Sequence, residues 1–288
     1  MTRLPLLAML LLLADPSVPL AQDRSFPTLR FVEAIRIADR RAGMDEPSGV
    51  AVSQDARHLW TVSDDARAVY LLGLDGDIRR RESFPITERG LEGIAVHPSG
   101  DLLAVKEETS EILVIGSDER RIVDRVALDR MLGYHLVAPE FAGGSRNRGL
   151  EGITIDPATG RVYVIKQSRP RLLIEISPDL RAITAVRELT AGAGFTDNNR
   201  RDRKIDVSGI AYDRWRDRFW IVSDTAQRVY LYDWARHQAV SAPLVWNDRG
   251  WRRTIEHAEG IAVDPAGDRL YIVTDDKGSS RLFVFRIE

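Results

Sequence analysis

Gly90-Leu91-Glu92-Gly93-Ile94-Ala95-Val96 is the stretch that decides the fold, because the chain repeats its pattern five times. An acidic residue stands at or near a glycine, and a short apolar run with β-branched residues follows. Such a run is typical of a buried strand, and the glycine marks a close approach of another backbone. The other four copies cover 46–52, 149–155, 206–212 and 258–264. Self-similarity at this spacing indicates a repeat architecture.

Each copy is followed by two more apolar runs. After the first copy these are Leu59-Trp60-Thr61-Val62-Ser63-Asp64 and Val69-Tyr70-Leu71-Leu72. Turn sequences such as His97-Pro98-Ser99-Gly100 separate the first two runs in most copies. Strands joined by turns, repeated with no helical pattern between them, are typical of the blades of a β-propeller.

The number of blades follows from the spacing of the motif glycines, which stand at 49, 93, 152, 209 and 260. Each interval is long enough for one four-stranded blade and too short for two. We therefore predict an all-β chain folded as a single propeller of five blades, or six if a degenerate blade is split across the termini. The last repeat ends after three strands, so we predict that 29–37 pairs with the strand around 282–285 and closes the ring.

Three of the intervals between motif glycines hold more residues than a four-stranded blade needs. The surplus residues fall at 132–144, 192–204 and 247–253, each just before an innermost strand. We predict that all three are loops on one face of the disc, where binding residues usually gather.

Several classes of protein are excluded or disfavoured by composition and motif. The net charge of −2 over 288 residues gives no reason to expect nucleic-acid binding. The absence of cysteine excludes a disulfide framework and a cysteine zinc site. A Walker loop, a nucleophile elbow and a His-Glu-x-x-His motif are also absent from the sequence.

The chain opens with a short basic start and an apolar stretch over 4–14, followed by small residues up to Ala21. We interpret 1–21 as a secretory signal peptide, which assigns 22–288 to the propeller and places it in the periplasm or outside the cell. An uncleaved membrane anchor is the alternative, although the apolar stretch is short for a span. We expect a monomer.

Antiparallel pairing fixes which strand ends meet. The start of the first strand and the end of the second lie at the same face, around one opening of the channel. We call this opening the acidic mouth. We predict metal ligands at its first-strand positions, which are Glu46, Glu92, Glu151, Asp206 and Glu259. We predict ligand-binding residues at its second-strand positions, which are Asp64, Lys106, Lys166, Asp224 and Asp275.

These acids cannot all stay ionised without a counter-charge, so either some are protonated, or lysines balance them, or a cation sits among them. Two carboxylates ~6 Å apart repel by roughly 3 kcal/mol at an effective dielectric of about 20. Lys106 and Lys166 would balance the blades of Glu92 and Glu151 in a ring of salt bridges, which leaves the remaining acids unbalanced. Since hard oxygen ligands suit calcium better than zinc, we predict that a divalent cation, calcium first, binds at the acidic mouth.

The motifs in this order resemble the SdiA-regulated domain family of bacteria. The resemblance covers roughly 31–288 and rests on four segments: Glu46-Pro47-Ser48-Gly49; Asn147-Arg148-Gly149-Leu150-Glu151-Gly152 with a following strand that ends at Lys166; Asp206-Val207-Ser208-Gly209 with Trp220-Ile221-Val222-Ser223-Asp224; and Ala258-Glu259-Gly260. It implies an exported or membrane-anchored propeller, compatible with bound calcium, and it implies no particular reaction.

Three functions remain open at this level. The first is a non-enzymatic propeller that binds a ligand or partner at the acidic mouth. The second is a calcium-dependent hydrolase of the lactonase or phytase-like esterase type, in which the metal polarises the substrate. The third is a purely structural interaction module, favoured if lysines and arginines neutralise the acids. We favour the first, because only carboxylates and His257 stand near enough to supply a catalytic base.

Overall fold

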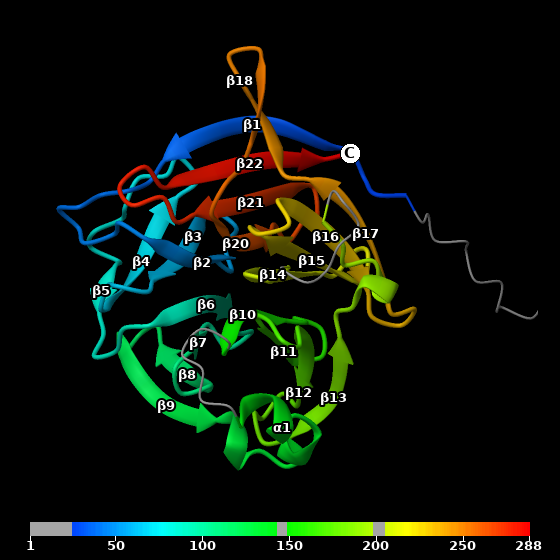
Figure 1. Ribbon diagram of the computed structural model, residues 1–288. Helices are drawn as coiled ribbons and strands as arrows, with labels where there is room; N and C mark the ends of the chain where they lie inside the picture. The colour runs from blue at the N-terminus through cyan, green and yellow to red at the C-terminus, as the bar shows by residue number, and fades with distance from the viewer. Residues whose placement is uncertain (1–24, 143–148, 198–204) are drawn as a thin grey trace, which may run out of the picture.

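The computed structural model describes residues 25–142, 149–197 and 205–288. Five four-stranded antiparallel sheets surround a central channel and form a five-bladed β-propeller (Figure 1). The predicted fold class and blade number are confirmed. The predicted signal peptide lies outside the described residues.

The first four blades are built alike, each from four consecutive strands that run from the channel outward. Blade 1 contains β2 (Pro47–Val52), β3 (His58–Ser63), β4 (Ala68–Gly73) and β5 (Phe84–Pro85). Blade 2 contains β6 (Leu91–Val96), β7 (Leu102–Lys106), β8 (Glu111–Gly116) and β9 (Arg121–Ala127). Blade 3 contains β10 (Leu150–Ile155), β11 (Val162–Lys166), β12 (Leu172–Ile176) and β13 (Ile183–Glu188). Blade 4 contains β14 (Gly209–Asp213), β15 (Arg218–Ser223), β16 (Arg228–Asp233) and β17 (Gln238–Pro243).

The fifth blade joins the two ends of the chain. It contains β20 (Ala258–Val263), β21 (Arg269–Thr274), β22 (Arg281–Ile287) and β1 (Leu29–Arg36), with β1 outermost. The register of β1 against β22 places Phe31 opposite Phe285 and Ile35 opposite Leu282. The predicted ring closure is therefore confirmed, and it covers the edge that β22 would otherwise expose.

The motif glycines lie where neighbouring innermost strands nearly touch. A Cβ atom on Gly49 would stand 2.5 Å from the carbonyl oxygen of Glu92. One on Gly93 would stand 2.8 Å from the Cα atom of Gly152. These neighbours are backbone atoms, so relief would require a whole strand to shift. The close approach predicted from the sequence is present.

The hydrophobic core lies between the blades. Leu103 and Val105 of blade 2, for example, are buried in one cluster with Val164 and Ile174 of blade 3. Because successive strand residues point to opposite faces, each blade packs against both neighbours. The interior is thus a closed series of sheet-on-sheet contacts around the channel.

The surplus residues form more structure than predicted. The connection before β10 holds the short helices η1 (Leu128–Arg130), η2 (Tyr134–Leu136) and α1 (Ala138–Phe141), and η3 (Ala191–Ala193) follows β13. The prediction of a plain loop over 247–253 is wrong, because β18 (Val245–Asp248) and β19 (Trp251–Thr254) pair there as a hairpin. Its turn residues Arg249 and Gly250 both have positive φ, +50° and +93°, as a two-residue type I′ turn requires.

In the described part of the chain, no helix has the length and apolar character needed to cross a membrane.

Candidate functional site

The residues just before the motif glycines form a ring at the acidic mouth. In blade order they are Ser48, Glu92, Glu151, Ser208 and Glu259. Glu151 is only 6% exposed, and the other two glutamates are partly buried. The channel below this ring narrows to a cavity of about 10 Å³, which is space for a single water molecule. A molecule larger than water therefore has no room to pass the ring.

The three ring glutamates interact with one another. Burial, followed by repulsion from Asp64, raises the pKa of Glu92 to about 8. Burial, followed by repulsion from Asp224, raises the pKa of Glu259 to about 8. Burial and then the charge of Glu92 raise the pKa of Glu151 well above its usual range. At neutral pH this ring holds protons that isolated carboxylates would release.

The two ring serines partly offset this effect. The Ser48 hydroxyl hydrogen-bonds to the Glu92 carboxylate and lowers its pKa, and Ser208 does the same for Glu259. Each serine therefore forms a hydrogen bond with the glutamate of the next blade. The Ser48 oxygen also accepts a bond of 3.3 Å from the Asp64 N–H, which fixes its position.

A second layer of acids lies at the ends of the second strands. Glu107 accepts a hydrogen bond of 3.2 Å from the Gly149 N–H and shares another with Glu151. Burial raises the pKa of Glu107, and that of Asp64 and Asp275 at the matching positions. A carboxyl pair that shares a proton is an arrangement able to donate and accept it.

The structure gives polar partners for both predicted lysines. Lys106 Nζ lies 2.6 Å from Glu88, so the expectation that it balances Glu92 is not met. A hydrogen bond from Lys106 and a second one from Arg125 lower the pKa of Glu88 to about 2. Lys166 is buried, and its ammonium group donates to the carbonyl oxygens of Ser168 and Pro170. Their role in ligand binding stays a prediction.

Glu46 and Asp206 occupy outer positions of the mouth. A hydrogen bond with Asp65 is the largest cause that raises the pKa of Glu46 to about 7. Burial and the charge of Asp275 add to this shift. The Asp206 N–H donates to Thr225 Oγ1 at 2.8 Å, and the Asp206 charge raises the pKa of Glu259. Both residues therefore lie close enough to other acids of the mouth to interact with them.

Three basic groups of the described residues act on these acids. Arg89 lowers the pKa of Asp64, and Lys277 lowers that of Glu46 and Asp275. The His257 backbone N–H donates to Asp224 Oδ1, and the Nδ1 atom of its imidazole ring lies 4.0 Å from Asp224 Oδ2. Across 25–142, 149–197 and 205–288, no set of three or more His, Cys, Asp or Glu side chains is arranged to hold a metal ion. Calcium binding therefore stays a prediction.

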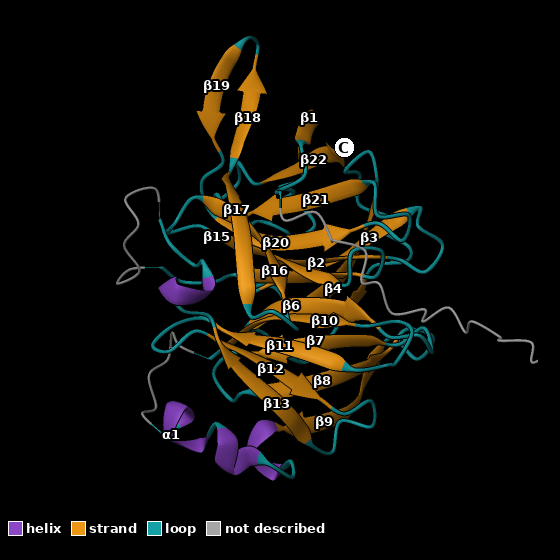
Figure 2. Ribbon diagram, turned by 90° about the vertical axis from the view of Figure 1, so that its right-hand side faces the viewer, coloured by secondary structure: helices purple, strands orange, loops and turns teal. Residues whose placement is uncertain are grey.

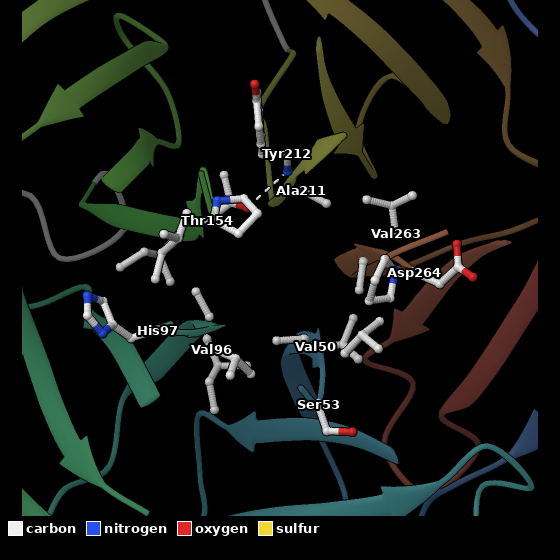
Figure 3. A pocket seen from close by; sticks show the side chains of 18 of the residues that line it. Val50, Ser53, Val96, His97, Thr154, Ala211, Tyr212, Val263 and Asp264 are labelled. Atoms are coloured by element: carbon white, nitrogen blue, oxygen red, sulfur yellow. Dashed lines mark hydrogen bonds between the residues drawn. The ribbon is translucent and has the colours of Figure 1, made fainter. Parts of the chain in front are cut away.

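The opposite opening of the channel has a different character. A cavity of about 310 Å³ lies there. Figure 3 shows Val50, Val96 and Val263 around it. The Tyr212 N–H donates to Thr154 Oγ1 at 2.9 Å and links blades 4 and 3 across its wall. Titratable groups that raise each other's pKa lie at the acidic mouth, which we therefore take as the candidate site.

The comparison with family models decides the family. A model described as SdiA-regulated matches residues 30–284, which is most of the chain. The chain belongs to the SdiA-regulated family. The resemblance drawn from the ordered motifs is confirmed.

Solved structures share the fold of this SdiA-regulated protein at low sequence identity. The glutaminyl cyclase of Myxococcus xanthus is 14% identical, with a TM-score of 0.60 over 90% of this chain and 96% of that chain. A chain of the nidogen/laminin complex is 17% identical, with a TM-score of 0.51 over 83% and 74%. A gluconolactonase of Xanthomonas campestris is 12% identical, with a TM-score of 0.49 over 92% and 99%. These likenesses concern the fold alone.

The structure adds Glu107 to the candidate site of this SdiA-regulated protein. From the sequence, we predicted the neighbouring Lys106 as the ligand-binding residue of this blade. The signal was present, because Glu107 follows β7 as Asp64 follows β3 and Asp224 follows β15. Because successive strand residues point to opposite faces, Lys106 and Glu107 cannot both face the site. The position of Glu107 within the repeat therefore identified the site residue better than the residue type did.

Proposed function

We propose that this SdiA-regulated protein is a binding propeller that takes a positively charged ligand at the acidic mouth. The observation that carries the proposal is the ring of Glu92, Glu151 and Glu259, whose burial and repulsion from neighbouring acids raise their pKa values. Acids buried together without a counter-charge reduce stability, and a cation bound among them would let them ionise. A binding role explains why an otherwise apolar propeller centre carries them.

Calcium is the first candidate ligand. It takes six to eight oxygen ligands in flexible geometry, whereas softer metals prefer nitrogen or sulfur. The ring supplies carboxylates and serine hydroxyls, and Asp64, Glu107, Asp224 and Asp275 stand at the ends of the second strands. Because the cavity below the ring is so small, the cation would sit between these two layers. An organic ammonium group is the other chemistry that the same charges would attract.

Calorimetric titration with calcium chloride tests this proposal. We expect binding to wild type, a higher melting temperature with calcium, and reversal by chelator, because calcium would bind the folded state alone. Glu259→Gln should weaken binding at least tenfold, whereas Asp118→Asn, at an exposed turn of blade 2, should not.

A parallel titration with a polyamine separates the two chemistries. Binding of the polyamine without calcium would assign an organic cation to the mouth. If neither probe binds at millimolar concentration, the proposal is wrong and the acids form a structural network.

A second candidate function is acid–base hydrolysis. It is favoured by the hydrogen bond between Glu107 and Glu151, since such a pair can supply an acid and a base. Chromogenic esters and lactones assayed with wild type and Glu151→Gln distinguish it. Turnover that Glu151→Gln abolishes would favour a hydrolase over a pure binding protein.

We further propose that the protein is exported, on the basis of the signal peptide interpreted over 1–21. Expressed with its full sequence, it should appear in the periplasm or medium with a mature terminus close to residue 22. Mass spectrometry of that fraction measures this. An intact Met1 terminus in the membrane fraction would instead indicate an anchor.

A further inference from the structure

The β18–β19 hairpin departs from the five-fold pattern of the propeller. Figures 1 and 2 both show it projecting beyond β1, the outer strand of blade 5. Its base is fixed by Trp246, whose ring centroid lies 5.6 Å from that of Phe31 and 5.4 Å from that of Phe283. The base therefore belongs to the core of the disc, and the tip stands clear of it.

The tip exposes a tryptophan. Trp251 is 75% exposed, and within the described part of the chain its side chain has no hydrogen bond or ring contact. Trp215 is also exposed, but its Nε1–H donates to the Pro265 carbonyl at 2.7 Å and the Arg214 guanidinium lies over its ring. A tight two-residue turn holds Trp251 out to solvent, and no polar or ring partner among the described residues explains why a tryptophan stands there.

The tip is also basic. Arg249 lies in the turn, and Arg252 and Arg253 are exposed beside Trp251 on β19. The only acid of the hairpin, Asp248, pairs with Arg253 at 2.8 Å. The tip thus carries a local positive charge on a chain whose net charge is −2.

We propose that this hairpin tip docks on an anionic lipid surface. Tryptophan and arginine together suit the headgroup layer, where indole rings concentrate and basic side chains meet anionic lipids. The tip is convex and only two strands wide, so it matches a soft layer that can close around it. A protein partner would need a concave pocket of matching shape. The inference is independent of the function proposed for the acidic mouth.

Docking through one hairpin should be weak, reversible and sensitive to salt. Each basic side chain at an anionic surface strengthens partitioning about fivefold, and salt screens this attraction. Replacing two arginines with glutamates both removes attraction and adds repulsion. We therefore expect Arg252→Glu/Arg253→Glu to weaken partitioning at least tenfold.

Co-sedimentation with vesicles tests the proposal. Wild type should bind vesicles of phosphatidylcholine with phosphatidylglycerol, bind pure phosphatidylcholine far less, and dissociate at high salt. The tip double variant and Trp251→Ala should each lose most of the binding. Arg120→Glu/Arg121→Glu, an equal charge change at exposed residues of blade 2, should bind like wild type.

The variants also separate docking from misfolding and from general charge effects. Because all four residues of β19 are exposed, the tip variants should melt like wild type. Equal loss in the two double variants would show that overall charge, not the hairpin, drives binding. Absence of binding to anionic vesicles, or binding to heparin or DNA in its place, would also overturn the proposal.

Discussion

Replacing Gly49 with alanine should destabilise the propeller by about 3 kcal/mol. The new Cβ atom would stand 2.5 Å from the Glu92 carbonyl oxygen and 2.8 Å from the Cα atom of Gly93. Overpacking of this kind costs roughly 1–3 kcal/mol, with the upper end expected where only backbone can move. For a chain of this size the melting temperature should fall by about 6–9 °C.

Gly192→Ala is the matched control. The nearest atom to its new Cβ would be Thr190 Oγ1 at 3.6 Å, which is ordinary contact. Such a change should be neutral or slightly stabilising, because alanine has less freedom in the unfolded chain. Thermal and urea denaturation of both variants measure the difference. Similar melting of the two would show that the innermost strands have room to separate.

The fold was predictable because the same sequence pattern recurs in every blade. A glycine at each point of backbone contact, followed by alternating turns and apolar runs, specifies the same blade five times. Ring closure then follows from a missing fourth strand and a spare strand at 29–36. The hairpin at 245–254 was missed because its residues were counted only as surplus. Its signal was Asp248-Arg249-Gly250 between Val245-Trp246 and Trp251, a turn flanked by apolar residues.

The candidate site was predictable in part. Glu92, Glu151 and Glu259 were found because each occupies the position before a motif glycine, and their proximity follows from the ring. The partner of Lys106 was not predicted, because Glu88 lies outside the repeated motifs and only the folded chain brings it to Lys106. The hydrogen bond between Glu107 and Glu151 likewise depends on distances between blades. Strand position is encoded locally, whereas pairing between blades is not.

The stability of the propeller should fall as the pH rises from about 4.5 to about 8. Folding raises the pKa of Glu92 and Glu259 from 4.5 to about 8, so between these values the folded state binds more protons than the unfolded state. Stability decreases with pH wherever the folded state holds the extra protons. For one such group the change has an upper limit of about 5 kcal/mol.

Glu259→Gln should therefore stabilise the protein at pH 8.5 and leave its stability at pH 4.5 nearly unchanged, since glutamine resembles the protonated acid. Urea denaturation across this range measures the slope. Glu88→Gln is the control of opposite sign, because its partners lower the pKa of Glu88 to about 2 and its ionised form stabilises the fold at neutral pH.

A bound cation would also change the pH dependence of stability. By favouring ionised carboxylates, it would return the pKa of Glu92 and Glu259 toward 4.5 and flatten the decline in stability above neutral pH. Wild type at pH 8.5 should then gain more from calcium than wild type at pH 5, and Glu259→Gln should gain less at either pH. A gain from calcium that is equal at both pH values would place the ion away from the acidic mouth.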